Sequence, residues 1–397
     1  MSDDIPPAEE PLGAFFGEIM KALTGSGGSP ANSGRDLARS IATDGKSEPN
    51  IDPSARLEIE ELLRVAELQV GEATQLRVSS GAPLKVDVVN RTLWIEAMID
   101  QFQPLLADIA RTISTASVAT ALPETAEHED NPMHQMFAGI SQLLETMLSA
   151  MTTGSLVGTL AQVAFGGFHL PIPRPQKSPL LILLPNLDEF GKQWSLDVAD
   201  LRLWVCLNET IHHTVLGIPH VAERINDLLK RHAKAFEYDA TSVSDSFGDL
   251  DLDVGPEMLF ALNERLTDPE LIFGSARSPT QEALSLEITA LLAAISGYVD
   301  QVMDKIGGKI IGSYSMITEA MRRRRVQTDA SDRFVERILG FDLDQSQYTR
   351  GTTFAEGVVE RAGPTGLDRL FDNPEHLPTP AEVDAPGLWL ARIDLPD

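Results

Sequence analysis

Hydrophobic residues recur every three or four positions through most of this chain, which is the spacing of one buried face on an α-helix. The clearest early example begins at Asp52-Pro53, a pair suited to the cap and first turn of a helix. Apolar side chains then follow at helical spacing at Ile59, Leu62, Leu63, Ala66 and Val70. Asn90 is placed to cap a second helix. The pattern predicts a mainly α-helical fold.

The helical pattern is interrupted between residues 168 and 184. Prolines at 171, 173, 175 and 179 keep this segment extended, because proline and the residue before it both disfavour helix. The run Leu180–Leu184 that follows is short and continuously apolar, which favours a buried strand. The predicted fold class is therefore mainly α with a minor β element.

Helical spacing resumes after the prolines. It predicts helices over residues 201–216, 222–236 and 279–306, another beginning at Pro256, and shorter ones to about Gly363. The proline-rich tail is expected to wrap back onto the body. Residues 1–50, with the run GSGGSP, are expected to be a flexible lead-in. Residues 51–397 are expected to form a single α-rich domain with three parts, over 51–167, 168–310 and 311–397.

Charge and composition narrow the classes of function. Among 397 residues, 59 are acidic and 32 are lysine or arginine, for a net charge of −27. Such a surface repels nucleic acid and anionic lipid, so neither is an expected partner. The first residues lack the pattern of a secretory signal, and no apolar run is expected to reach the roughly 18–20 residues that a membrane span needs. With Cys206 as the single cysteine, a reduced, cytoplasmic setting is expected.

The segment Leu201–His220 carries the candidate chemistry. On a helix, its apolar residues share one face with Asn208 and His212, which lie one turn apart, while Glu209 lies at the edge of that face. Burying an amide or an imidazole without a partner costs on the order of 1–3 kcal/mol. The two side chains therefore need a metal ion, each other, or groups from another helix.

The sequence Asn-Glu-x-x-His at 208–212 differs by one residue from His-Glu-x-x-His. In that motif, two histidines one turn apart bind zinc and the glutamate accepts a proton from the metal-bound water. Asparagine replaces the first histidine poorly, because its neutral, hard amide oxygen suits calcium better than zinc. The alternative is a buried Asn208–His212 hydrogen bond on an ordinary core helix.

Longer segments extend the match: ARLEIEELLRVAELQVGEAT, LLILLPNLDEFGKQW, LRLWVCLNETIHH, ISGYVDQVMDKIGG, FVERILGFDLDQSQYTRGTTF and PEHLPTPAEVDAPGLWLARI. Through them, nearly the whole chain resembles an actinobacterial family of zincin-like metallopeptidases. The resemblance implies a zincin-like metallopeptidase fold and a zinc cofactor. It places the catalytic base at Glu209 and the metal ligands at Asn208, His212 and Ser296. The family has histidine at the first of these ligand positions and an acidic residue at the last.

Asn208 and Ser296, which stand at two of the family's ligand positions, bear directly on zinc binding. A zinc site takes about three or four ligands, and only His212 is a good one here. The sequence therefore predicts weak or no zinc binding by the family geometry. A rearranged site that draws on Glu209, His212 or His213, His220 and Asp300 stays open as an alternative.

Two functions follow from these residues. The first is a hydrolase, a peptidase or amidase that acts through Glu209 and a metal at His212. The second is a non-catalytic pseudoenzyme that binds a peptide or protein partner in the former active-site cleft. Two further features are predicted to lie at the surface: His169, and the basic run Arg322–Arg325 as a solvated helix face that pairs with nearby acids.

Overall fold

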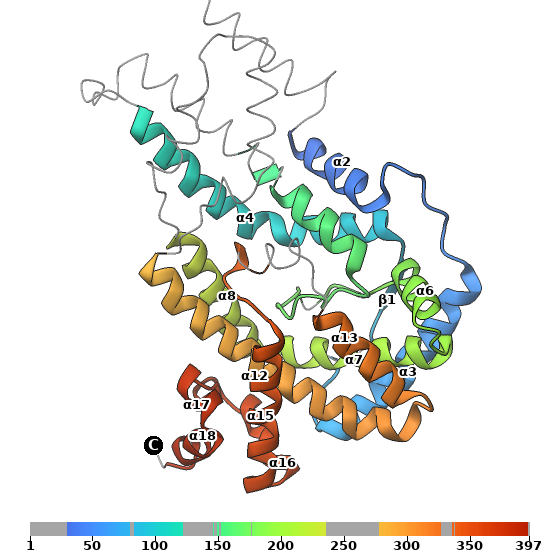
Figure 1. Ribbon diagram of the computed structural model, residues 1–397, viewed down its shortest axis with the longest axis vertical. Coiled ribbons are helices and arrows are strands. Elements are labelled where there is room, and N and C mark those ends of the chain that lie inside the picture. Colours follow the sequence, from blue (N-terminus) through green and yellow to red (C-terminus); the bar gives the residue numbers. More distant parts are fainter. Residues whose placement is uncertain are drawn as a thin grey trace, which may run out of the picture.

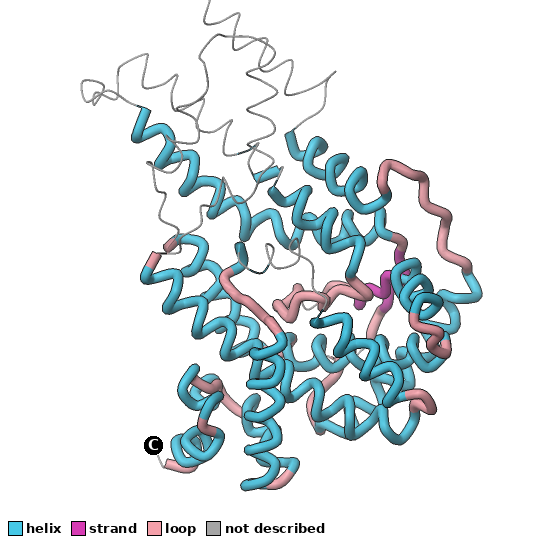
Figure 2. The backbone as a smooth tube through the Cα atoms, in the orientation of Figure 1, coloured by secondary structure: helices cyan, strands magenta, loops and turns pink. Residues whose placement is uncertain are grey.

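The computed structural model describes residues 30–79, 83–121, 146, 149–150, 152–175, 177–235, 278–326, 336 and 338–395. Figures 1 and 2 show a helical molecule with one short pair of strands, which confirms the predicted fold class. The elements in chain order are α2 (Pro30–Thr43), α3 (Pro53–Thr74), β1 (Val86–Val89), α4 (Arg91–Ala121), β2 (Leu180–Leu183), α6 (Leu184–Gln193), α7 (Val198–Leu216), α8 (Pro219–Lys234), α12 (Pro279–Ile310), α13 (Tyr314–Val326), α15 (Gln345–Ala362), α16 (Pro364–Asp368), η2 (Arg369–Phe371), η3 (Pro374–His376), α17 (Pro380–Asp384) and α18 (Pro386–Ile393).

Helix α12 is the centre of the core. It packs against α15, α8, α7 and α3, and Figure 1 shows it running beside α8. Every residue from Ile288 to Val299 is buried. The helix is long and apolar enough to cross a membrane by length and composition, yet 78% of that apolar window is buried inside the fold. The expectation that no apolar run reaches the length of a membrane span is therefore wrong for this helix, whose burial is that of a core helix.

The predicted strand is confirmed as β2, where all four side chains are buried. It pairs in parallel with β1, in a register that sets Val86 opposite Leu180 and Val88 opposite Ile182. On its other side, Gly166 forms an antiparallel bridge with Ile182. This small sheet fixes residues 165–168 beside α7.

Both predicted helix caps are confirmed. The side chain of Asp52 accepts a hydrogen bond from the amide of Ser54, with Pro53 as the first residue of α3. The side chain of Asn90 accepts from the amide of Leu93 at 3.0 Å. These bonds satisfy amides that have no partner within their own helix.

The start of the chain differs from the prediction in one respect. The expected flexible lead-in over residues 1–50 contains helix α2, which packs against α4 with Ala38 and Ala42 buried. The serine, asparagine and glycine content of this region favours flexibility, but Gly34 of α2 permits a close contact instead: a Cβ there would lie 2.4 Å from the carbonyl oxygen of Ala150. The helix predicted to begin at Pro256 lies outside the described residues.

The contact between α12 and α15 depends on glycine. A Cβ on Gly351 would lie 2.0 Å from the carbonyl oxygen of Ala293. This overlap is with backbone, so no side chain can move to relieve it and the helices themselves would have to shift. We expect Gly351→Ala to lower the free energy of unfolding by about 1–3 kcal/mol, because it separates the two central helices. Chemical denaturation followed by circular dichroism measures this loss.

The matched control is Gly308→Ala, in the last turns of α12, where a Cβ meets nothing within 4 Å. Alanine is the better helix former there, so a gain of roughly 0.5–1 kcal/mol is expected. Equal stability of the Gly351→Ala variant and the wild type would contradict the close approach of α12 and α15.

Candidate functional site

Helix α7 carries the predicted motif and begins three residues earlier than expected. The side chain of Asp197 caps it by accepting from the amide of Asp200 at 2.9 Å, and Gly217 ends it. The helix packs against α3, α6, α12 and β2. One side of α7, which includes Asn208, Glu209 and His212, faces a cavity.

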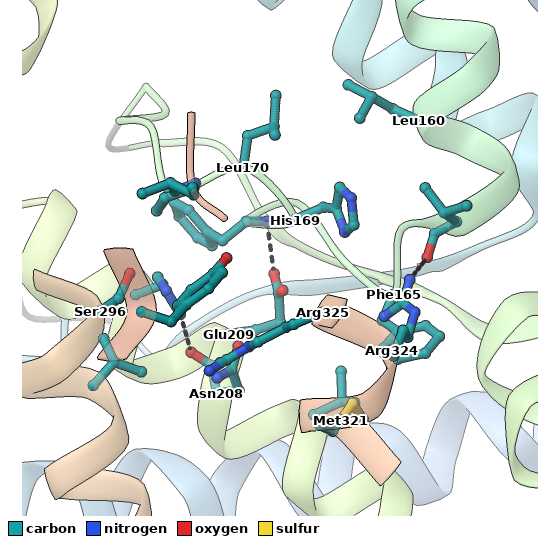
Figure 3. A pocket seen from close by; sticks show the side chains of 18 of the residues that line it. Leu160, Phe165, His169, Leu170, Asn208, Glu209, Ser296, Met321, Arg324 and Arg325 are labelled. Carbon is teal, nitrogen blue, oxygen red and sulfur yellow. Dashed lines mark hydrogen bonds between the residues drawn. The ribbon is translucent and has the colours of Figure 1, made fainter. Parts of the chain in front are cut away.

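That cavity has a volume of about 290 Å³, at the lower end of the range for ligand pockets. Its lining combines Asn208, Glu209 and His212 of α7 with Ser296 of α12. Figure 3 shows Arg324 and Arg325 entering from another helix, which is α13. The four residues predicted for the site are thus brought together, although they come from segments far apart in the chain.

Residues 165–168 form one wall, and hydrogen bonds to three elements hold them. The carbonyl of Phe165 accepts from the amide of Leu183, and the carbonyl of Gly166 accepts from the indole of Trp94 at 2.9 Å. Glu209 completes the set by accepting from the amides of Gly167 at 2.8 Å and Phe168 at 3.1 Å. Position 166 requires glycine, because a Cβ would overlap the Glu209 carboxyl group at 2.3 Å.

Glu209 is therefore deeper than its predicted place at the edge of the helix face. Its side chain is 3% exposed, and the two amide donors share one carboxyl oxygen. Burial raises the pKa of Glu209 to about 7, against the opposing effects of the Phe168 amide and the charge of Arg174. A carboxyl group with this pKa can hold or release a proton near neutral pH.

His212 is neutral at physiological pH. Burial is the main cause that lowers its pKa to about 4. Its Nδ1 lies 2.9 Å from the backbone carbonyl of Asn208, and a carbonyl can only accept, so Nδ1 carries the proton. The predicted bond to the Asn208 side chain is thus replaced by one to its backbone. Nε2 keeps a lone pair, and the ring stacks on Phe168 at 6.1 Å.

Asn208 and Ser296 line the cavity at two of the predicted ligand positions. Ser296 is 6% exposed and Asn208 is partly buried. In the described part of the chain, neither the carboxamide nor the hydroxyl makes a hydrogen bond. The two groups can therefore donate to, or accept from, a ligand in the cavity.

The predicted pairing of the run Arg322–Arg325 with nearby acids is confirmed by the ion pairs Arg323–Glu319 and Arg325–Asp300, but the predicted solvated face is wrong for the second half of the run. Arg322 and Arg323 are exposed, but Arg324 and Arg325 line the cavity. Arg325 donates to both carboxyl oxygens of Asp300. Burial acts to lower the pKa of Arg325, but the attraction of Asp300 and Tyr348 and the hydrogen bonds to Asp300 together raise it. The sequence held a signal for this placement, because 324 and 325 continue the helical spacing of the buried residues Ile317 and Met321.

His169 is also placed differently from its prediction. It lines the cavity, and burial, with a contribution from the charge of Arg324, lowers its pKa to about 3. Neither His169 nor Arg324 and Arg325 belongs to a motif. The helical spacing of the two arginines is the only sequence signal for their place at the cavity.

The alternative metal site is not assembled. Asp300 is paired with Arg325, and neither His213 nor His220 lines the cavity. Within the residues that the structure describes, no three histidine, cysteine, aspartate or glutamate side chains lie close enough together to hold a metal ion. The proposed rearrangement of His213, His220 and Asp300 around a metal is therefore not supported.

The side chains at the predicted ligand positions do not fit a zinc ion. His212 supplies one good ligand atom, whereas Asn208 and Ser296 supply neutral oxygens, and Glu209 is held by backbone amides. Two guanidinium groups line the same cavity and repel a divalent cation. Donor chemistry and charge both disfavour zinc.

Comparison with known proteins gives two matches. The family profile described as zincin-like metallopeptidase matches residues 32–390. A crystal structure of a protein from Chloroflexus aurantiacus, described as "a putative hydrolase with a novel fold", has a TM-score of 0.63 and 22% sequence identity. The match covers 92% of this chain and 99% of that one. The search of curated proteins found no match.

Proposed function

This chain belongs to the zincin-like metallopeptidase family, and we propose that it has kept the fold of a hydrolase as a pseudoenzyme. In this role it binds a peptide or protein partner in the cavity between α7, α12 and α13, without a catalytic zinc ion. The observation that carries the proposal is the cavity lining: one good zinc ligand, two neutral substitutes and two arginines.

Glu209 supports the same proposal. A catalytic base must be within reach of the proton that it removes, with its carboxylate directed at the reacting group. Here one carboxyl oxygen accepts from two backbone amides and so positions residues 167 and 168. We infer that Glu209 shapes the wall of the binding cavity.

A second function is favoured by the protonation states. Glu209 has a pKa of about 7, and His212 offers the lone pair of Nε2. A proton acceptor near neutrality and a neutral imidazole are the groups that hydrolysis of a peptide or amide bond needs. Metal content and peptidase activity distinguish this hydrolase from the pseudoenzyme.

The test is zinc analysis of protein purified without a chelator and without a metal-affinity resin. We expect far less than one zinc ion per chain and no cleavage of a mixture of unstructured peptides. Stoichiometric zinc that is lost in His212→Ala would overturn the pseudoenzyme. As the positive arm, Asn208→His combined with Ser296→Glu should gain zinc binding in calorimetry, because it supplies two further ligands. Failure of that gain would contradict the placement of the ligand positions.

A further inference from the structure

Two guanidinium groups are held in place at the cavity before any ligand binds. Arg325 donates to Asp300 at 3.2 and 3.3 Å and stacks over the ring of Tyr348, 4.5 Å from its centre. Arg324 lies 3.8 Å over the ring of Phe165 and donates to the carbonyl of Val163. Because both side chains are already ordered, a ligand that contacts them does not have to order them.

Each of the two histidines of the cavity lies near enough to an arginine of α13 to be influenced by its charge. Burial is the main cause of the low pKa of each ring. Repulsion by Arg324 adds to it at His169, and repulsion by Arg325 adds to it at His212. Asp300 acts in the opposite direction at His212, but its effect is smaller than that of Arg325.

Two acidic side chains also line the cavity, and each accepts hydrogen bonds from backbone amides. Glu209 accepts from Gly167 and Phe168. Glu336 accepts from the amide of Leu343 at 3.0 Å. Around the two guanidinium groups, the lining also presents the uncharged polar groups of Asn208 and Ser296, both of which can donate a hydrogen bond.

We propose that this cavity binds a carboxylate group of the partner, with Arg324 and Arg325 providing the positive charge that a metal ion would otherwise provide. The proposal rests on the proposed function, since it names the chemistry of the bound peptide. A carboxylate accepts several hydrogen bonds at once and pairs well with guanidinium. A volume of about 290 Å³ suits a chain end or one acidic side chain rather than a long peptide.

The test compares three small peptides by isothermal titration calorimetry. The first is N-acetyl-Ala-Ala with a free carboxylate, the second is its C-terminal amide, and the third is N-acetyl-Ala-Asp amide. A chain-end site binds the first, a side-chain site binds the third, and neither kind of site binds the neutral amide. Loss of a charged hydrogen bond should weaken binding about tenfold or more in Arg324→Gln and in Arg325→Gln.

Arg323→Gln is the matched control. Arg323 is exposed on the same helix and pairs with Glu319, so binding should not change. Circular dichroism shows whether each variant folds. If Arg325→Gln does not fold, Arg325→Lys replaces it in the binding comparison, because lysine keeps the charge that pairs with Asp300 but lacks the paired donors of guanidinium.

Equal affinity for the acid and amide peptides, or no binding of either acid, would overturn carboxylate recognition. Neither result alters the zinc content, which tests the pseudoenzyme by itself. Acid binding that requires stoichiometric zinc would overturn both proposals.

Discussion

Replacing Glu209 with alanine is expected to lower the free energy of unfolding by roughly 2–6 kcal/mol. The change leaves the amides of Gly167 and Phe168 without their acceptor inside the protein. Each buried, unsatisfied donor costs about 1–3 kcal/mol. Chemical denaturation of the two proteins at pH 7 measures the difference. An unchanged stability would show that Glu209 does not hold the wall, and would favour the hydrolase.

The control is Glu209→Gln, which keeps an acceptor oxygen in nearly the same shape and should cost much less. This variant also separates the effect of the Glu209 charge from that of its hydrogen bonds. Burial raises the pKa of Glu209 from 4.5 to about 7, so between these pH values the folded protein holds a proton that the unfolded chain has released. The contribution of Glu209 to wild-type stability then falls as pH rises from 4.5 through 7, by on the order of 3 kcal/mol, and is level above that range.

The Glu209→Gln variant lacks this titrating group, so its unfolding free energy should lack that part of the slope. Denaturation midpoints at several pH values between 4 and 8 provide the comparison. Parallel pH profiles for the wild type and the glutamine variant would contradict a carboxyl group whose pKa is raised by burial.

Trp389→Ala is expected to cost about 3–5 kcal/mol, because it empties a large, fully buried site. Trp389 anchors the C-terminal tail: its side chain is 0% exposed and its ring meets Phe354 edge-on, with centroids 5.5 Å apart. The indole nitrogen donates to the carbonyl of His376 at 2.6 Å. The change leaves that carbonyl without its donor and frees α17 and α18 from α15.

Leu388 provides the control one residue earlier. It is 54% exposed, so Leu388→Ala should change stability by less than about 0.5 kcal/mol. Limited proteolysis should release the tail from the Trp389→Ala variant at temperatures where the Leu388→Ala variant stays intact. Equal resistance of the two variants would contradict the anchoring role of Trp389.

Much of the helical framework could be predicted because its signals are local. Asp52 and Asn90 cap helices through bonds to amides two or three residues away, and periodic apolar residues mark the buried faces of α3 and α7. Strand β1 was missed, because four residues interrupted by Asp87 carry no clear pattern. Its partner β2 lies far along the chain, and the pairing is visible only in the fold.

The candidate site likewise has features that the sequence predicted and features that only the fold shows. Helical spacing placed Asn208 and His212 on one face, and the family resemblance pointed to Ser296. The engagement of Glu209 with residues 167 and 168 could not be predicted, because it joins a helix to a segment about forty positions earlier in the chain. Arg324 and Arg325 were predicted at the surface, because charge was weighed above their position on the helix.

Local sequence alone determines where α3 and α4 begin, which faces of α3 and α7 are buried, and that Asn208 and His212 lie on the apolar face of α7. These properties depend on hydrogen bonds and side-chain spacing within a few residues. The tertiary structure alone decides which buried polar groups meet. It directs one carboxyl group toward two amides and brings two guanidinium groups to a cavity that contains one good zinc ligand. Such encounters join distant segments, and packing across the whole core determines them.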